Sequence, residues 1–131
     1  MKIMVGYRNS DASRRALELA CKQAQSETSA LVYVITSTEG GSAETLDSIQ
    51  EVEENLQWAK NYMIQGKVAC EALQLARGLA PGEDLVKFAM DNAIDHIFIG
   101  IEKKSRTRKL LLGSTAQFII LRGPCPVTTT K

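Results

Sequence analysis

Two glycines and a run of basic residues near the end of the chain have the types and spacing to bind phosphate. Gly100 follows an apolar run, where the missing side chain lets a ligand approach the backbone. Gly113 and Ser114 stand at the expected start of a helix, whose free N–H groups and positive dipole end attract anions. Between them lie five bases, Lys103, Lys104, Arg106, Arg108 and Lys109, and the segment 103–109 that holds these bases contains no acid. This segment predicts an anion site, and the structural alternative is a solvated basic loop followed by a helix cap.

The side chains needed for phosphotransfer, ATP hydrolysis or zinc binding do not form a comparable cluster in the sequence. Tyr7, Arg8 and Asn9 follow the first apolar run, so a phospho-receiver's clustered carboxylates are missing there, as is a general base for an ATPase. Arg8 has two interpretations, as an anion ligand or as the partner of an acid such as Asp11. The single histidine, His96, starts a later run, at the end opposite the expected site. One histidine and three scattered cysteines match no zinc motif, and the G-x-x-x-x-G-K-[ST] phosphate loop is absent.

Short apolar runs alternate with amphipathic stretches along the chain, and together they must position the candidate residues. The apolar runs predict strands over residues 2–7, 31–36, 68–75, 96–100 and 127–130. Apolar residues three or four apart predict a helix over residues 11–25 and a long one along the stripe from Leu46 to Met63. Shorter helices are expected from Pro81 and from Gly113. These stripes place Leu46 and Ile120 on buried helix faces.

The alternation of strands and helices predicts the fold class. We expect one domain over residues 1–131, of the α/β class, with an open, mainly parallel five-stranded sheet and helices on both faces. Ligands of such sheets bind at the carboxyl ends of the strands. The segments expected to meet there are residues 7–9, residues 34–36 and the chain from Gly100 onward. Pro126, at the start of the last strand, favours a sheet edge for that strand.

Two segments of the chain resemble a known family. Residues 100–115, G-I-E-K-K-S-R-T-R-K-L-L-L-G-S-T, and residues 122–127, R-G-P-C-P-V, are similar to the C-terminal signature of the universal stress protein (UspA-like) family. The opening I-M-V-G-Y-R-N-S-D-A-S-R-R-A-L is similar to the family's first strand and helix, so the resemblance covers the whole chain. It implies a Rossmann-like fold of the adenine nucleotide alpha hydrolase type, with strand order 3-2-1-4-5. It also implies a stress-response regulator that forms a homodimer through the last strand, at Val127, Thr128 and Thr129.

Members of this family that bind ATP carry G-x-x-G-x9-G-[ST], and the chain keeps part of that pattern. Gly100 matches its first glycine, and Gly113 and Ser114 match its end at the intact spacing. Lys103 replaces the second glycine, and Glu102 stands where binders often have arginine. A lysine adds bulk there but is itself a phosphate ligand, whereas a glutamate repels an anion. The resemblance therefore implies a phosphate site that is altered but not lost.

The nucleoside end of the implied site departs further from the family. Arg8 replaces an aspartate that contacts the nucleoside in ATP binders, and a guanidinium accepts no hydrogen bond. The resemblance thus implies a degenerate adenine-nucleotide site, for AMP or for ATP with Mg²⁺. Its candidate residues are Gly6, Tyr7, Arg8, Val34, Ile99, Gly100, Glu102, Lys103, Gly113, Ser114 and Thr115. The alternatives are a family member that binds no nucleotide and acts as a dimer on protein partners, and a slow ATPase.

Composition narrows the partners and the compartment. Sixteen Lys and Arg against fifteen Asp and Glu give a net charge of +1, which disfavours a general nucleic-acid binder. No apolar run is long enough to cross a membrane, and the first residues enter a strand directly, without the pattern of a signal peptide. The three cysteines are far apart and odd in number, as in a reduced protein. We therefore expect a cytoplasmic protein that does not enter membranes.

Overall fold

The computed structural model describes residues 1–38, 46–101 and 112–131, and it has the expected parallel α/β architecture. The strands are β1 (Lys2–Gly6), β2 (Leu31–Ser37), β3 (Ala69–Leu75), β4 (His96–Gly100) and β5 (Val127–Thr130). The helices are α1 (Asp11–Gln25), α2 (Leu46–Gln65), α3 (Pro81–Asp91) and α4 (Ser114–Arg122). The five-stranded sheet has the order β3-β2-β1-β4-β5 with every neighbouring pair parallel, which confirms the predicted fold class and strand order.

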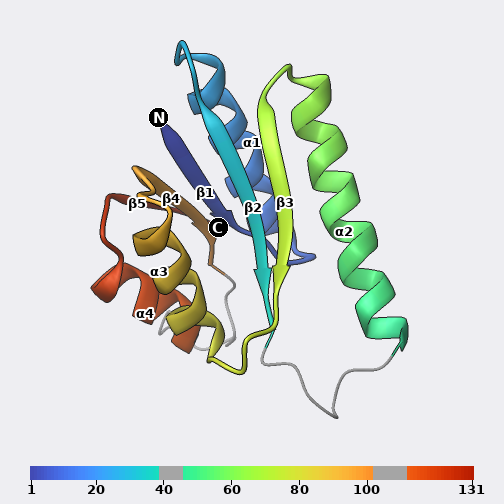
Figure 1. Cartoon of the computed structure of the whole chain (residues 1–131), viewed down its shortest axis with the longest axis vertical. Coiled ribbons are helices and arrows are strands. Elements are labelled where there is room, and N and C mark those ends of the chain that lie inside the picture. Colours follow the sequence, from blue (N-terminus) through green and yellow to red (C-terminus); the bar gives the residue numbers. More distant parts are fainter. Residues whose placement is uncertain (39–45, 102–111) are drawn as a thin grey trace.

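The sheet forms the middle of three layers (Figure 1). Helices α1 and α2 cover one face, and α3 and α4 cover the other. Along β1, Ile3 and Val5 pack into the core beneath α1 and α2, whereas Met4 packs beneath α3 and α4. Successive side chains of a strand point to opposite faces, so a central strand covered on both faces must be apolar throughout. This explains the continuous apolar runs of the sequence.

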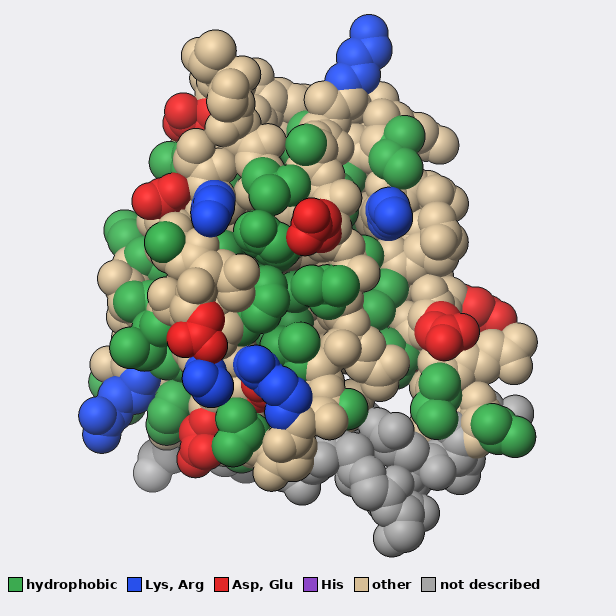
Figure 2. All heavy atoms as spheres, in the orientation of Figure 1, with side chains coloured by type: hydrophobic (Ala, Val, Ile, Leu, Met, Phe, Trp, Pro, Cys, Tyr) green, Lys and Arg blue, Asp and Glu red, His purple; other side chains and the backbone are tan. Residues whose placement is uncertain are grey.

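Two side chains predicted to be buried are exposed, because each lies where its helix has no neighbour. Leu46 is 85% exposed at the first residue of α2, whose buried positions begin further along the helix. In α4, Ile119 enters the core and Phe118 contacts α3 at Gly82, which turns the following residue, Ile120, outward. The face of the sheet beyond α3 is also partly open, with hydrophobic side chains gathered over β2 and β3 (Figure 2). Helical spacing identifies a face, but it does not say how far the neighbouring layer extends.

The carboxyl edge of the sheet is tied together by short-range contacts. Ser10 is the N-cap of α1, and its Oγ accepts a hydrogen bond from the N–H of Ser13 at 3.1 Å. The Thr36 hydroxyl donates to the carbonyl oxygen of Tyr7 at 2.9 Å and joins the ends of β1 and β2. Among the described residues, none of the helices combines the length and apolarity needed to cross a bilayer.

Candidate functional site

A cavity opens at the carboxyl edge of the sheet, where the ends of β1, β2 and β4 meet the N-terminal parts of all four helices. Its volume is about 520 Å³, within the range of sites for small molecules. A hollow of about 70 Å³ adjoins it, and the two share several lining residues: Arg8, Ser13, Gly100, Ser114, Thr115 and Ala116. We call the two together the strand-end cavity. Its position agrees with the rule for open parallel sheets.

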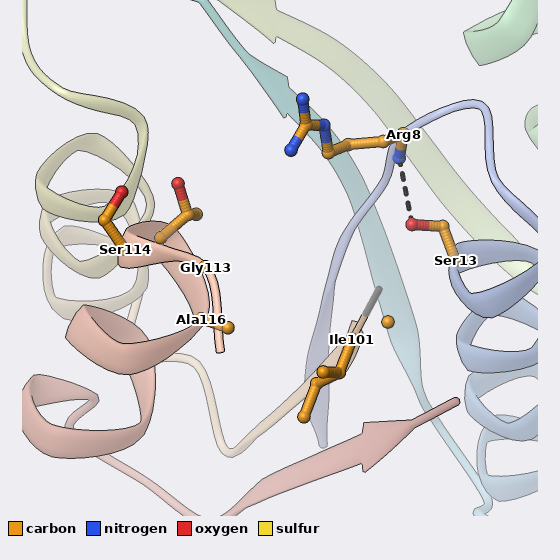
Figure 3. A pocket seen from close by; sticks show the side chains of 8 residues that line it. Arg8, Ser13, Ile101, Gly113, Ser114 and Ala116 are labelled. Atoms are coloured by element: carbon orange, nitrogen blue, oxygen red, sulfur yellow. Dashed lines mark hydrogen bonds between the residues drawn. The ribbon is translucent and has the colours of Figure 1, made fainter. Parts of the chain in front are cut away.

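The α4 end of the strand-end cavity is polar and positively charged. Gly113 is the N-cap of α4 and provides no side-chain hydrogen bond, so the N–H groups of the first turn have no side-chain cap. Ser114 and Thr115 add two hydroxyl groups to the same wall. Figure 3 shows the Arg8 side chain extending from the end of β1 toward Gly113 and Ser114. Within the part of the chain that the structure describes, the Arg8 guanidinium forms no ion pair, so the alternative pairing with Asp11 is absent.

The backbone that carries Arg8 is fixed by α1 and β4. The backbone N–H of Arg8 donates to Oγ of the buried Ser13 at 3.2 Å (Figure 3). Gly100 lies against the same turn of α1: a Cβ on this residue would stand 2.4 Å from the Ser13 nitrogen and 2.5 Å from the Ala12 carbonyl carbon. Gly100 is therefore required for close packing of the backbone, in addition to lining the cavity.

Ser37, at the β2 end of the strand-end cavity, belongs to a hydrogen-bonded set of three side chains whose other two members do not line the cavity. The Ser37 hydroxyl donates to Oδ2 of Asp84 at 2.9 Å. Nε of Arg77 donates to Oδ1 of the same carboxylate at 2.7 Å, and Nη2 of Arg77 also pairs with it. Asp84 is 0% exposed and lies in the first turn of α3, where a carboxylate also interacts favourably with the positive end of the helix dipole.

The remaining walls combine apolar and polar groups. Tyr7 is buried, and this burial raises the pKa of its hydroxyl, although a hydrogen bond and the charge of Arg14 act in the opposite direction. Tyr7 therefore stays protonated at neutral pH. Val52 and Leu85 bring apolar surface from α2 and α3, and Glu51 brings a carboxylate from α2. Among the described residues, no three His, Cys, Asp or Glu side chains lie close enough to hold a metal ion.

The structure brings most of the predicted site residues together. The cavity lining includes Gly6, Tyr7, Arg8, Ile99, Gly100, Gly113, Ser114 and Thr115. Val34 is fully buried beneath the wall, which its neighbours Ile35 and Thr36 form instead. Glu102 and Lys103 lie outside the described residues.

Sequence reasoning missed the polar residues that α2 contributes to the cavity. Ser48, Glu51 and Asn55 recur three or four positions apart, so they share one helix face with Val52. That spacing was a usable signal, because it places polar groups beside an apolar stripe. No sequence pattern could have predicted the hydrogen bond between Ser37 and Asp84, because the two residues are 47 positions apart.

Comparisons with known proteins agree with this architecture. A family model described as the Universal stress protein family matches residues 1–131. A universal stress protein from Archaeoglobus fulgidus has a TM-score of 0.88 and 34% identity, covering 100% of this chain and 93% of its own. A second one, from Archaeoglobus fulgidus in complex with dAMP, has a TM-score of 0.83 and 30% identity, covering 99% and 96%. No curated protein matches the chain.

A more distant structure shares the fold alone. It is a universal stress protein family protein from Arabidopsis thaliana with AMP bound. Its TM-score is 0.69 at 18% identity, and the likeness covers 100% of this chain and 91% of that one.

Proposed function

This chain belongs to the universal stress protein family, and from that premise we propose that its strand-end cavity binds an adenine nucleotide. The observation that carries the proposal is the Arg8 guanidinium, which extends toward the uncapped first turn of α4 across a cavity of nucleotide size. Further support comes from the 30%-identical relative, whose structure is a complex with dAMP.

In this proposal the phosphates bind at the α4 end. The N–H groups of the first turn and the hydroxyls of Ser114 and Thr115 donate to phosphate oxygens. Arg8 adds a charged donor, and hydrogen bonds from charged groups are about twice as strong as neutral ones. Arg8 thus removes a nucleoside contact of the family but supplies a phosphate contact. The ligand is AMP, or ATP with Mg²⁺ held by the phosphate oxygens.

The base and ribose occupy the rest of the cavity. Ile35, Val52 and Leu85 provide apolar surface for a flat ring, and polar groups of β2 and α2 lie around it. A nucleotide with its phosphates on α4 extends from there toward the end of β2. This orientation gives Arg8 and the β2 residues separate roles, one for phosphate and the other for the base.

The proposal is tested by titration with a fluorescent ATP analogue, displaced by unlabelled ATP or GTP, with and without Mg²⁺. We expect saturable micromolar binding that ATP reverses, and about tenfold weaker ATP binding by Arg8→Gln. Lys22→Gln removes the same charge from an exposed position in the last turn of α1 and should bind ATP as the parent does. The absence of displaceable binding up to millimolar ATP in the parent protein would refute the proposal.

A slow ATPase is a second candidate, favoured by the Glu51 carboxylate in the cavity wall. A general base must reach the attacking water, and among the described lining residues Glu51 is the carboxylate available. Hydrolysis that is linear in time and lost in Glu51→Gln would establish this function. Nucleotide binding without hydrolysis would leave binding as the activity of the cavity.

We also propose that the protein is a homodimer of the cytoplasm. The order of the described sheet leaves β5 as an edge strand, with one side open to pairing. The three cysteines are unpaired, as is usual in a reducing compartment. The dimer acts through protein partners, and bound nucleotide is the signal that controls this action.

A further inference from the structure

We propose that Ser37 selects the base: its hydroxyl oxygen accepts a hydrogen bond from an exocyclic amine of the bound nucleotide. The inference rests on the proposed nucleotide site and deepens it, because it names the chemical group that the β2 end recognises. It follows from the direction of one hydrogen bond, from the position of Ser37 in the cavity, and from the contacts that hold its side chain in place.

The direction of the Ser37 hydrogen bond is set by its partner. A guanidinium always carries its protons and only donates, so the Asp84 carboxylate serves as an acceptor for Arg77 on Oδ1. The other oxygen, Oδ2, lies 2.9 Å from Oγ of Ser37. A carboxylate in this role has no proton to give, so the Ser37 hydroxyl must donate. The hydroxyl proton is then used in the hydrogen bond to Asp84, so the Ser37 oxygen can only accept hydrogen bonds from other partners.

The position of Ser37 matches the base end of a bound nucleotide. Ser37 is half-buried in the cavity wall, beside Thr36 and near Leu85. The phosphate-binding groups, Arg8 and Ser114, belong to the opposite part of the same cavity. A nucleotide that spans the cavity therefore brings the edge of its base, and neither its phosphates nor its ribose, to Ser37.

The contacts of Asp84 hold Ser37 in a single arrangement. The Asp84 side chain is fully buried, and its backbone N–H donates to the Ala80 carbonyl at 3.0 Å in the first turn of α3. The Arg77 side chain contacts both the carboxylate and the backbone of Asp84, because Nη2 also lies 3.4 Å from the Asp84 carbonyl oxygen. A hydroxyl held in this way is ordered before the ligand arrives, so little entropy is lost on binding.

Because the Ser37 oxygen is a fixed acceptor in the cavity wall, it discriminates between purines by the substituent on their carbon 6. The amino group of adenine donates to it, whereas the keto oxygen of hypoxanthine opposes a second set of lone pairs. A base with hydrogen at this position leaves the acceptor without a partner. Leaving a buried acceptor unpaired lowers affinity by about tenfold, which is the preference that we expect for AMP.

The experiment measures the binding of AMP, purine riboside 5′-monophosphate and inosine 5′-monophosphate by isothermal titration calorimetry. We expect the parent protein to prefer AMP to the purine riboside nucleotide by about tenfold. In Ser37→Ala the preference should fall to within about twofold, while affinity for the purine riboside nucleotide stays near the parent value. Ser29→Ala removes a hydroxyl from an exposed position outside the cavity lining and should keep the preference for AMP.

A second variant tests the direction of the hydrogen bond itself. In Asp84→Asn, the amide can donate to Ser37 and release the hydroxyl proton toward the ligand. The ratio of AMP to inosine 5′-monophosphate affinity should then shift toward the inosine nucleotide, in protein shown by circular dichroism to be folded. An AMP preference that survives in Ser37→Ala, or is absent in a parent protein that binds AMP, overturns the inference alone. A parent protein that binds none of the three nucleotides overturns the proposed function as well.

Discussion

Gly100 lies where β4 passes the first turn of α1, and this contact leaves no room for a side chain. The atoms that a Cβ would meet, at 2.4 to 2.8 Å, belong to the backbone of Ala12 and Ser13 and cannot rotate away. Overpacking of this kind typically costs about 1–3 kcal/mol. We predict that Gly100→Ala lowers the free energy of unfolding by about 2–3 kcal/mol, measured by urea denaturation.

Gly78 is the control for Gly100, because it is a glycine with space for a side chain. Gly78 has a φ of +74° and nothing within 4 Å of its ideal Cβ, so only its backbone conformation matters. Asparagine tolerates this conformation, and Gly78→Asn should change stability by less than about 1 kcal/mol. Equal effects of the two substitutions would show that β4 and α1 can move apart at Gly100.

Asp84 gives a second prediction at the scale of single residues. Removing one partner of a buried ion pair typically costs about 3–5 kcal/mol, because the remaining charge is left unpaired. The Arg77 side chain is 40% exposed and can be hydrated, so we predict a smaller loss of about 2–3 kcal/mol for Asp84→Ala. Lys87→Ala breaks the exposed pair with Asp91 and should cost less than about 0.5 kcal/mol. Thermal or urea unfolding of the two variants compares them directly, and equal losses would contradict this account.

Arg8 shows how far single residues could be understood from the sequence. Its place after β1 was correctly predicted, because the strand pattern and the N-cap at Ser10 fix the chain on both sides. The direction of its side chain was not, since it extends toward Ser114, which is far away in the sequence. A family comparison by position therefore identified a lost nucleoside contact, and only the structure shows the group that Arg8 approaches instead.

At the scale of elements, periodicity predicted nearly every helix and strand. Helix α1 and strands β4 and β5 have the expected bounds, because each carries a complete pattern with a clear stop. The two errors concern burial. Leu46 and Ile120 do lie in helices, but no neighbouring element that the structure describes covers their side chains. The link from Ser37 on β2 to Asp84 on α3 likewise depends on how layers meet, which local patterns do not contain.

The pairing of β4 with β5 predicts a dependence of stability on pH. The ring of His96 lies 2.7 Å from the Thr128 hydroxyl and stacks on Phe98 at 4.3 Å between centroids. Burial lowers the pKa of His96 from its ordinary value of 6.5. The unfolded chain therefore binds the proton more readily, so stability is fully present above about pH 6.5 and falls as pH drops through the folded pKa.

We predict that His96→Gln removes this part of the pH dependence. His96 is the only histidine of the chain, so the difference between parent and variant isolates its titration. Urea midpoints at about pH 7.5 and about pH 5.5 give that difference, and the parent should lose more stability between them than the variant. Parallel losses in the two proteins would show that the folded and unfolded states bind the His96 proton equally.

At the scale of the whole molecule, helices cover the faces of the sheet and leave its edges as sites for assembly. On β5, the carbonyl oxygens of Pro126 and Thr130 accept hydrogen bonds from the N–H groups of Ile97 and Ile101, at 3.0 and 2.6 Å. Backbone groups alternate along a strand, so those of Val127 and Thr129 point to the open edge. The hydroxyl of Thr130 donates to the Ala12 carbonyl at 2.7 Å and holds β5 against α1.

These contacts predict how a dimer through β5 can be broken without unfolding the protomer. Thr129→Pro removes an N–H group that faces the open edge and leaves the hydrogen bonds to β4 in place. We therefore expect the parent protein to sediment as a dimer and Thr129→Pro as a folded monomer, measured by analytical ultracentrifugation at several concentrations. Thr129→Val keeps the N–H group and should remain a dimer, which separates the loss of a backbone donor from the loss of the hydroxyl. A parent protein that is monomeric at micromolar concentration, or a dimer that persists in Thr129→Pro, would show that the edge of β5 is not the interface.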